Sequence, residues 1–94
     1  MDKKKLRIAI LKEIDNGNKQ LSESDFKVEE EVFDEAVNFL VREKYLAGIF
    51  YADNRPQFFE ASCNLTEKGE EYLSENSAIA KTYKGLKEIR SWLP

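Results

Sequence analysis

The chain has 94 residues, of which 41% are hydrophobic and 35% are charged, and its formal net charge at pH 7 is −3. This length suits one folded domain with one core and leaves no room for a second. The longest apolar run covers only residues 8–11, far short of the roughly 20 residues that a membrane-spanning helix needs. We therefore expect no transmembrane helix and, because the N-terminal residues lack a secretory apolar segment, a cytoplasmic location.

The chain has no histidine and a single cysteine, Cys63. The usual side-chain sets for metal binding, acid–base catalysis and nucleophile activation are therefore missing. We predict a protein that is not an enzyme and that has neither a metal site nor a cofactor. No basic residue lies within two positions of Cys63, which indicates an inert thiol.

Helical spacing marks three stretches of the N-terminal half. Apolar residues predict a first helix over 3–15, and Gly17 is expected to end it because glycine readily adopts the left-handed conformation. Ser22 followed by Asp25 is typical of an N-cap and predicts a short helical turn. The clearest pattern predicts a third helix over 29–45. Its apolar stripe consists of Phe33, Ala36, Val37 and Leu40.

A β-hairpin is predicted next. Aromatic and β-branched residues indicate strands over 49–52 and 57–61, joined by a turn at 53–56. Phe58 and Phe59 would then point to opposite faces, so one of them is expected to be partly exposed. A short third strand near Leu21 or Leu65 is a further possibility.

Two helices are predicted in the C-terminal third. Thr66 is typical of an N-cap and predicts a helix to about residue 75. Apolar residues then recur at intervals of three and four, which predicts one amphipathic helix over 79–93. Gly85 in its middle either allows a close backbone approach or is a tolerated weakness of about 1 kcal/mol relative to alanine. Trp92 falls off the stripe and is either a cap on the core edge, which we favour, or an exposed anchor for a second subunit.

This order of elements predicts a single α+β domain of the winged-helix class, in which a two-stranded wing follows a helix-turn-helix pair. The helix-turn-helix would cover about 3–45, the wing about 48–61 and the additional C-terminal helices about 66–93.

A resemblance to known proteins supports this fold. Residues 65–69, Leu-Thr-Glu-Lys-Gly, are similar to the LTxKG element that follows the wing in many winged-helix regulators. More closely, the whole chain resembles the YjcQ family of small bacterial and prophage-borne winged-helix proteins, most clearly at 5–14, 34–40, 53–56 and 65–70. The resemblance implies the fold and a bacterial or phage setting. It implies no biochemical activity, and no functional residue can be transferred.

Charge is sorted along the chain. Residues 1–19 carry six bases against three acids, whereas residues 20–60 carry four bases against ten acids. Residues 61–76 are acidic again, and residues 77–94 are basic. Such asymmetry marks either a binding face or ion pairing between packed elements, and we favour the second interpretation.

The predicted third helix is the element that would read DNA in the major groove. Helical projection places five of its residues on the solvent face: Glu31, Asp34, Glu35, Asn38 and Arg42. Three of them are acids, which disfavours contact with phosphates. Asn38 and Arg42 have the chemistry to contact base edges, but both residue types are usually just solvated. Arg55 at the expected wing tip is a weak candidate for minor-groove contact because Asp53 lies beside it.

A candidate basic patch comes from the two ends of the chain: Lys3, Lys4, Lys5, Arg7, Lys81, Lys84 and Lys87. Lysines that surround a buried helix face explain it equally simply, and we favour that interpretation. If DNA is bound at all, this patch predicts weak, salt-sensitive and sequence-independent binding.

The preferred functional hypothesis is a regulatory or interaction module that binds a protein partner through the acidic surface of the third helix and the wing. The alternative is a DNA-binding transcriptional regulator that uses the same helix and wing. A homodimer through the terminal helices is a further hypothesis, because they carry more apolar residues than one thin stripe buries.

Overall fold

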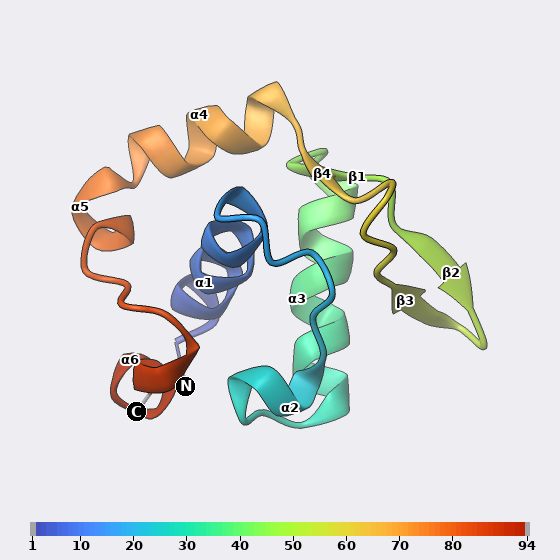
Figure 1. The fold of residues 1–94 in the computed structure, drawn as a ribbon, viewed down its shortest axis with the longest axis horizontal. Coiled ribbons are helices and arrows are strands. Elements are labelled where there is room, and N and C mark those ends of the chain that lie inside the picture. The colour runs from blue at the N-terminus through green and yellow to red at the C-terminus, as the bar shows by residue number, and fades with distance from the viewer. Residues whose placement is uncertain (1, 94) are drawn as a thin grey trace.

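The computed structural model describes residues 2–93 as an α+β fold built around one central helix (Figure 1). The elements are α1 (Lys3–Asp15), α2 (Glu23–Phe26), α3 (Glu30–Arg42), β1 (Leu46–Ala47), β2 (Phe50–Ala52), β3 (Arg55–Gln57), β4 (Asn64–Leu65), α4 (Glu67–Glu75), α5 (Ser77–Ala80), the 3₁₀ turn η1 (Leu86–Glu88) and α6 (Ile89–Trp92). The helices and the hairpin follow the order of a winged helix, as predicted.

Helix α1 lies at the centre of the core and is covered by α3, α4 and the C-terminal segment (Figure 1). Its apolar residues are almost fully enclosed by the rest of the same chain, since Ile8, Ile10 and Leu11 each have 0% exposure. The surplus of apolar residues that suggested a dimer through this helix is therefore used within the monomer. This removes the part of the hypothesis that rested on α1, while Ile79, Leu86 and Leu93 of the C-terminal segment are only partly buried and the oligomeric state stays a prediction.

Side chains cap the starts of α1 and α2, of which only the second was predicted. Asp2 accepts hydrogen bonds from the backbone N–H groups of Lys4 and Lys5 and begins α1. Asp25 accepts a hydrogen bond from the backbone N–H of Ser22 at 2.8 Å, which fixes the start of α2. The third helix ends at Arg42 rather than at residue 45, because Lys44 adopts a left-handed conformation with φ of 65°.

The hairpin is tighter than predicted. Asp53 and Asn54 alone form its turn, with φ values of 54° and 63°, the left-handed geometry of a two-residue hairpin loop. Arg55 therefore pairs with Ala52 as the first residue of β3 and does not lie at the tip. The prediction of the second strand over 57–61 is wrong, because β3 runs over Arg55–Gln57 and Phe58 and Phe59 follow it. Phe58 packs on the core while Phe59 is 52% exposed, so the expectation that one of the two is exposed is confirmed.

The predicted third strand exists near Leu65, but it does not extend the hairpin. Strand β4 pairs antiparallel with β1, with Leu46 opposite Leu65, while β2 pairs with β3 in a separate sheet. The β1–β4 pair ties the end of α3 to the start of α4. The base of the hairpin is held by this closure.

The single helix predicted over 79–93 is wrong. Helix α5 ends at Ala80, and Gly85 with φ of 99° breaks the chain direction before η1 and α6. No atom lies within 4 Å of the position that a Cβ on Gly85 would occupy. Its role is therefore the positive φ, and neither close approach nor tolerated weakness explains it.

Two tertiary hydrogen bonds hold this broken C-terminal segment on α1. The indole Nε1 of Trp92 donates to the carbonyl of Lys5 at 2.9 Å, and Trp92 is only 7% exposed. The hydroxyl of Tyr83 donates to Glu13 at 2.6 Å, and its ring packs edge-on against Trp92. Trp92 is therefore a cap on the core edge, as favoured, and the alternative of an exposed anchor is wrong.

The Glu13–Tyr83 pair is a buried polar contact that the sequence pattern did not reveal. Glu13 is 9% exposed and also accepts a hydrogen bond from the Asn18 side chain at 3.0 Å. Burial, and then the neighbouring Glu13 carboxylate, raise the pKa of Tyr83, so the phenol stays a neutral donor around neutral pH.

We expect Tyr83→Phe to lower the free energy of unfolding by about 1–3 kcal/mol, because it leaves a buried carboxylate oxygen without its donor. Tyr51→Phe is the matched control, since it removes a hydroxyl that also bonds a side chain but on an exposed residue. Its effect should stay within about 0.5 kcal/mol. Urea unfolding of both variants measures the difference, and equal values would contradict the role given to Glu13.

No helix formed by residues 2–93 combines the length and the apolar character required to cross a bilayer.

Candidate functional site

The hairpin β2–β3 folds back against α3, and one arginine makes most of the polar contact. The Arg55 guanidinium forms a bidentate pair with Asp34 on α3, with Nε–Oδ2 and Nη2–Oδ1 distances of 2.8 and 3.0 Å. It also donates to Glu23 on α2 at 2.9 Å and lies 3.3 Å from Glu30. We call these four residues the Arg55 cluster. One cation here links the hairpin to two helices.

In the Arg55 cluster, three carboxylates surround the positive charge of one guanidinium. Hydrogen bonds to Asp34 and then to Glu23 raise the pKa of Arg55, which stays charged at every accessible pH. A backbone hydrogen bond, and then the Arg55 guanidinium, lower the pKa of Glu23. With three carboxylates around one arginine, the cluster as a whole is anionic. Arg55 is therefore already paired with protein carboxylates, which disfavours its binding to a phosphate.

A second hydrogen bond fixes the other strand of the hairpin. The Tyr51 hydroxyl on β2 donates to Asn38 on α3 at 2.7 Å. Burial, and then Asp34, raise the pKa of Tyr51. Asn38 is exposed, yet its side-chain oxygen already accepts this hydrogen bond from the hairpin.

We expect Arg55→Gln to loosen the hairpin from α3, because glutamine cannot bridge three carboxylates and leaves them repelling each other. Amide hydrogen exchange of Phe50, Ala52 and Gln57 should accelerate relative to the parent chain, while exchange within α1 stays unchanged. Arg42→Gln is the control, since Arg42 is exposed and its one ion pair, with Glu43, is long at 3.9 Å. Unchanged exchange in Arg55→Gln would show that the hairpin is held by its apolar contacts alone.

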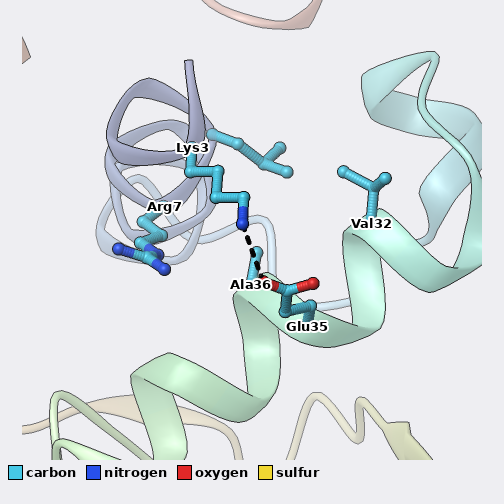
Figure 2. A pocket seen from close by; sticks show the side chains of 6 residues that line it. Lys3, Arg7, Val32, Glu35 and Ala36 are labelled. Atoms are coloured by element: carbon cyan, nitrogen blue, oxygen red, sulfur yellow. Dashed lines mark hydrogen bonds and ion pairs between the residues drawn. The ribbon is translucent and has the colours of Figure 1, made fainter. Parts of the chain in front are cut away.

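The predicted solvent face of α3 is therefore only partly free. Glu31, Glu35 and Arg42 are exposed as projected. Asp34 is not, because its side chain is only 16% exposed beneath Arg55, and this part of the projection is wrong. Glu35 turns toward α1 and pairs with Lys3 at 3.2 Å beside a cavity of about 50 Å³ (Figure 2).

The predicted basic patch is brought together in part. Lys5 and Lys84 line one open cleft of about 260 Å³ beside Trp92, which places the two chain ends together. Lys4, Lys81 and Lys87 are exposed. Lys3 is paired with Glu35, and Arg7 lies under the Phe39 ring on the side toward α3.

Exposed aromatic residues on the hairpin are the feature that sequence reasoning undervalued. Phe50 is 55% exposed and Phe59 is 52% exposed, and their rings meet edge-on at 5.4 Å. We call these two residues the aromatic pair. Tyr51 beside them is 51% exposed. Strand alternation predicted that one of Phe58 and Phe59 is exposed. That the Phe50 ring lies against Phe59 follows only from the folded structure.

The single cysteine lies in the core. Cys63 has 0% exposure, and burial raises the pKa of its thiol, so it stays protonated at neutral pH. Among residues 2–93, no three acidic, cysteine or histidine side chains are grouped in a way that would hold a metal ion.

Comparison with known proteins agrees with this geometry. The family model described as YjcQ protein matches residues 4–92. The chain belongs to the YjcQ family. It is 55% identical to the Bacillus subtilis (strain 168) protein described as uncharacterized protein YjcQ, over 99% of both chains. The solution NMR structure of the YjcQ protein from Bacillus subtilis matches with a TM-score of 0.72 and 52% identity, over 85% of this chain and 97% of that one. The family resemblance seen in the sequence is thereby confirmed.

Proposed function

We propose that this YjcQ-family chain is a non-enzymatic regulatory or interaction module of a bacterial or prophage system, and that it binds a protein partner through the surface formed by α3 and the hairpin. The observation that carries the proposal is the exposed aromatic pair, which has no covering element within residues 2–93. Aromatic side chains are enriched in the centres of protein–protein interfaces, where they dominate the binding energy.

The charge around the aromatic pair supports a protein rather than a nucleic acid. Asp53 at the hairpin tip and Glu60 next to Phe59 are both exposed, and Glu31 is exposed on α3. The one cation of the hairpin, Arg55, is already paired with carboxylates. An apolar centre with an acidic rim suits a protein surface that offers apolar and basic side chains.

DNA binding is the second candidate function. The element order of a winged helix favours it by analogy, and Lys5 and Lys84 lie together at the chain ends. The hairpin arginine that such a regulator would use is engaged, and exposed acids occupy the face of α3. Contact through the basic patch would give only weak, salt-sensitive binding without base specificity.

Site-specific photocrosslinking tests the preferred function. A benzophenone amino acid in place of Phe59 should join one protein covalently in an extract of the source cells, and Phe50→Ser should abolish the adduct. The same amino acid in place of exposed Ser91 on α6 is the control and should give no such adduct. Equal adducts at both positions, or an adduct with nucleic acid at position 59, would overturn the proposal.

A further inference from the structure

A row of aromatic rings lies where α1, α3 and α4 meet, on a different side of α3 from the Arg55 cluster. The ring centroids of Phe39 and Tyr45 are 6.4 Å apart, and Tyr45 stacks on Tyr72 at 4.5 Å. All three rings are half-buried and pack against the core. We call them the aromatic row.

Three cations lie over this row. The Arg7 guanidinium is 3.6 Å from the centre of the Phe39 ring, and that of Arg42 is 5.4 Å from the same centre. Lys68 on α4 lies 5.5 Å from the centre of the Tyr45 ring. These residues are far apart in the sequence, and packing of α1 against α3 and α4 gathers them around one row of rings. Ring faces attract cations, which explains how the charges are held but not why they are gathered.

The charges of these cations are poorly compensated, in contrast to Arg55. Within residues 2–93, Arg7 and Lys68 make no ion pair, and the single ion pair of Arg42 is the 3.9 Å approach to Glu43. Figure 2 shows that Lys3 takes the nearby Glu35 carboxylate while the Arg7 guanidinium points away from that pair. The Nε of Arg7 is buried without a hydrogen-bond partner. Because this Nε is enclosed, a ligand from solvent would have to contact the terminal Nη groups of the guanidinium.

We propose that Arg7, Arg42 and Lys68 bind the carboxylates of a short acidic peptide segment of a partner protein. A guanidinium that lies flat on an aromatic ring is oriented by it and still presents N–H groups at its edge. Such an edge matches a carboxylate, with two parallel hydrogen bonds. Lys68 supplies a second, separate positive charge on α4, which favours a segment with more than one acidic side chain.

The surrounding charges favour a short peptide over a nucleic acid. Glu43 follows Arg42 and Glu67 precedes Lys68 in the sequence, Glu35 lies on α3, and the chain is acidic overall. A phosphate backbone carries a charge at every nucleotide and would meet these carboxylates, whereas a few acidic side chains need contact only the cations. This surface is distinct from the aromatic pair on the hairpin, so the inference stands or falls separately from the proposed function.

NMR titration of the ¹⁵N-labelled chain with a hexaglutamate peptide at low salt tests the inference. We expect saturable shifts confined to the signals of Arg7, Arg42, Lys68 and their neighbours, including the guanidinium signals of Arg42. Hexaglutamine of the same length should cause none. Arg42→Gln and Lys68→Gln should each weaken binding about three- to tenfold, because each removes one charge-assisted contact. Lys84→Gln, outside the three cations, is the matched control and should leave the affinity unchanged.

Arg42 and Lys68 are exposed, so their variants should fold even if Arg7→Gln, which removes a packed side chain, does not. The absence of saturable shifts would overturn the inference. So would equal shifts at Lys81, Lys84 and Lys87, which would indicate unspecific attraction to any positive charge. Tighter binding of hexathymidylate than of hexaglutamate at the same residues would overturn it in favour of a nucleic-acid site.

Discussion

Replacing Phe33 by alanine should lower the free energy of unfolding by about 3–5 kcal/mol, the loss typical of a large buried aromatic side chain. Phe33 is 2% exposed, and its ring centroid lies 5.8 Å from Phe26 on α2 and 6.0 Å from Phe58 after the hairpin. The substitution removes the one ring that packs α2, α3 and the returning hairpin together, and these elements cannot collapse into the space independently.

Phe59→Ala is the matched control for Phe33→Ala, since the same atoms are removed from a side chain that is 52% exposed. We expect it to change the free energy of unfolding by no more than about 0.5 kcal/mol. Urea denaturation followed by circular dichroism measures both variants. Similar losses in the two would show that Phe33 is not the centre of this packing.

Gly69→Ala should destabilise the chain by about 3 kcal/mol, although glycine-to-alanine changes inside helices usually stabilise by about 1 kcal/mol. A Cβ at Gly69 would lie 2.2 Å from the carbonyl oxygen of Tyr45 and 3.3 Å from Leu65 Cγ. The carbonyl belongs to the backbone and accepts a hydrogen bond from the Thr66 N–H at 3.1 Å, so it cannot rotate away without breaking that bond. Helix α4 would have to move off the end of α3, which breaks the contacts that start it.

Ser74→Ala is the control for Gly69→Ala, because Ser74 is exposed on the same helix and alanine gains helix propensity there. It should leave stability unchanged or slightly raised. Thermal unfolding of the two variants separates a helix-propensity effect from a steric one. An alanine at position 69 that stabilises the chain would contradict the close approach.

The Leu-Thr-Glu-Lys-Gly stretch that carried the family resemblance thus has a physical explanation. Leu65 pairs in β4, and Thr66 caps α4 by accepting a hydrogen bond from the Gly69 N–H at 2.9 Å. The Thr66 hydroxyl also donates to the carbonyl of Lys44 at 2.6 Å. Gly69 allows the helix to approach Tyr45. Leu65, Thr66 and Gly69 thus each contribute to the junction of α3, β1, β4 and α4.

Capping and turn residues in the sequence predicted the helix ends that are fixed within one helical turn. The end of α1 and the start of α4 were predictable because Gly17 and Thr66 act within one helical turn. The C-terminal segment was not predictable, because spacings of three and four are also satisfied by short turns. Its path is set by Tyr83 on Glu13 and Trp92 on Lys5, which are 70 and 87 positions apart in sequence.

For the candidate site, the sequence predicted only which side of the third helix each residue occupies. Helical projection correctly predicted that Glu31 and Arg42 are exposed. It assumed, however, that other elements cover only one side of α3. The two-residue turn at Asp53 and Asn54 brings Arg55 back over Asp34, and no helical periodicity contains that information. The aromatic row and its cations were invisible for the same reason, since they come from three separate helices and the connection after α3.

Titration of the chain with mixed duplex DNA at low and near-physiological salt tests the central claim that the α3–hairpin surface binds protein and not DNA. Arg42→Glu, Arg55→Glu and Lys84→Glu are measured beside the parent chain. We predict no binding near physiological salt, and at low salt only weak binding that Lys84→Glu reduces. Sequence-specific binding near physiological salt that is lost in Arg42→Glu or Arg55→Glu, but kept in Lys84→Glu, would contradict the claim and identify a DNA-reading regulator.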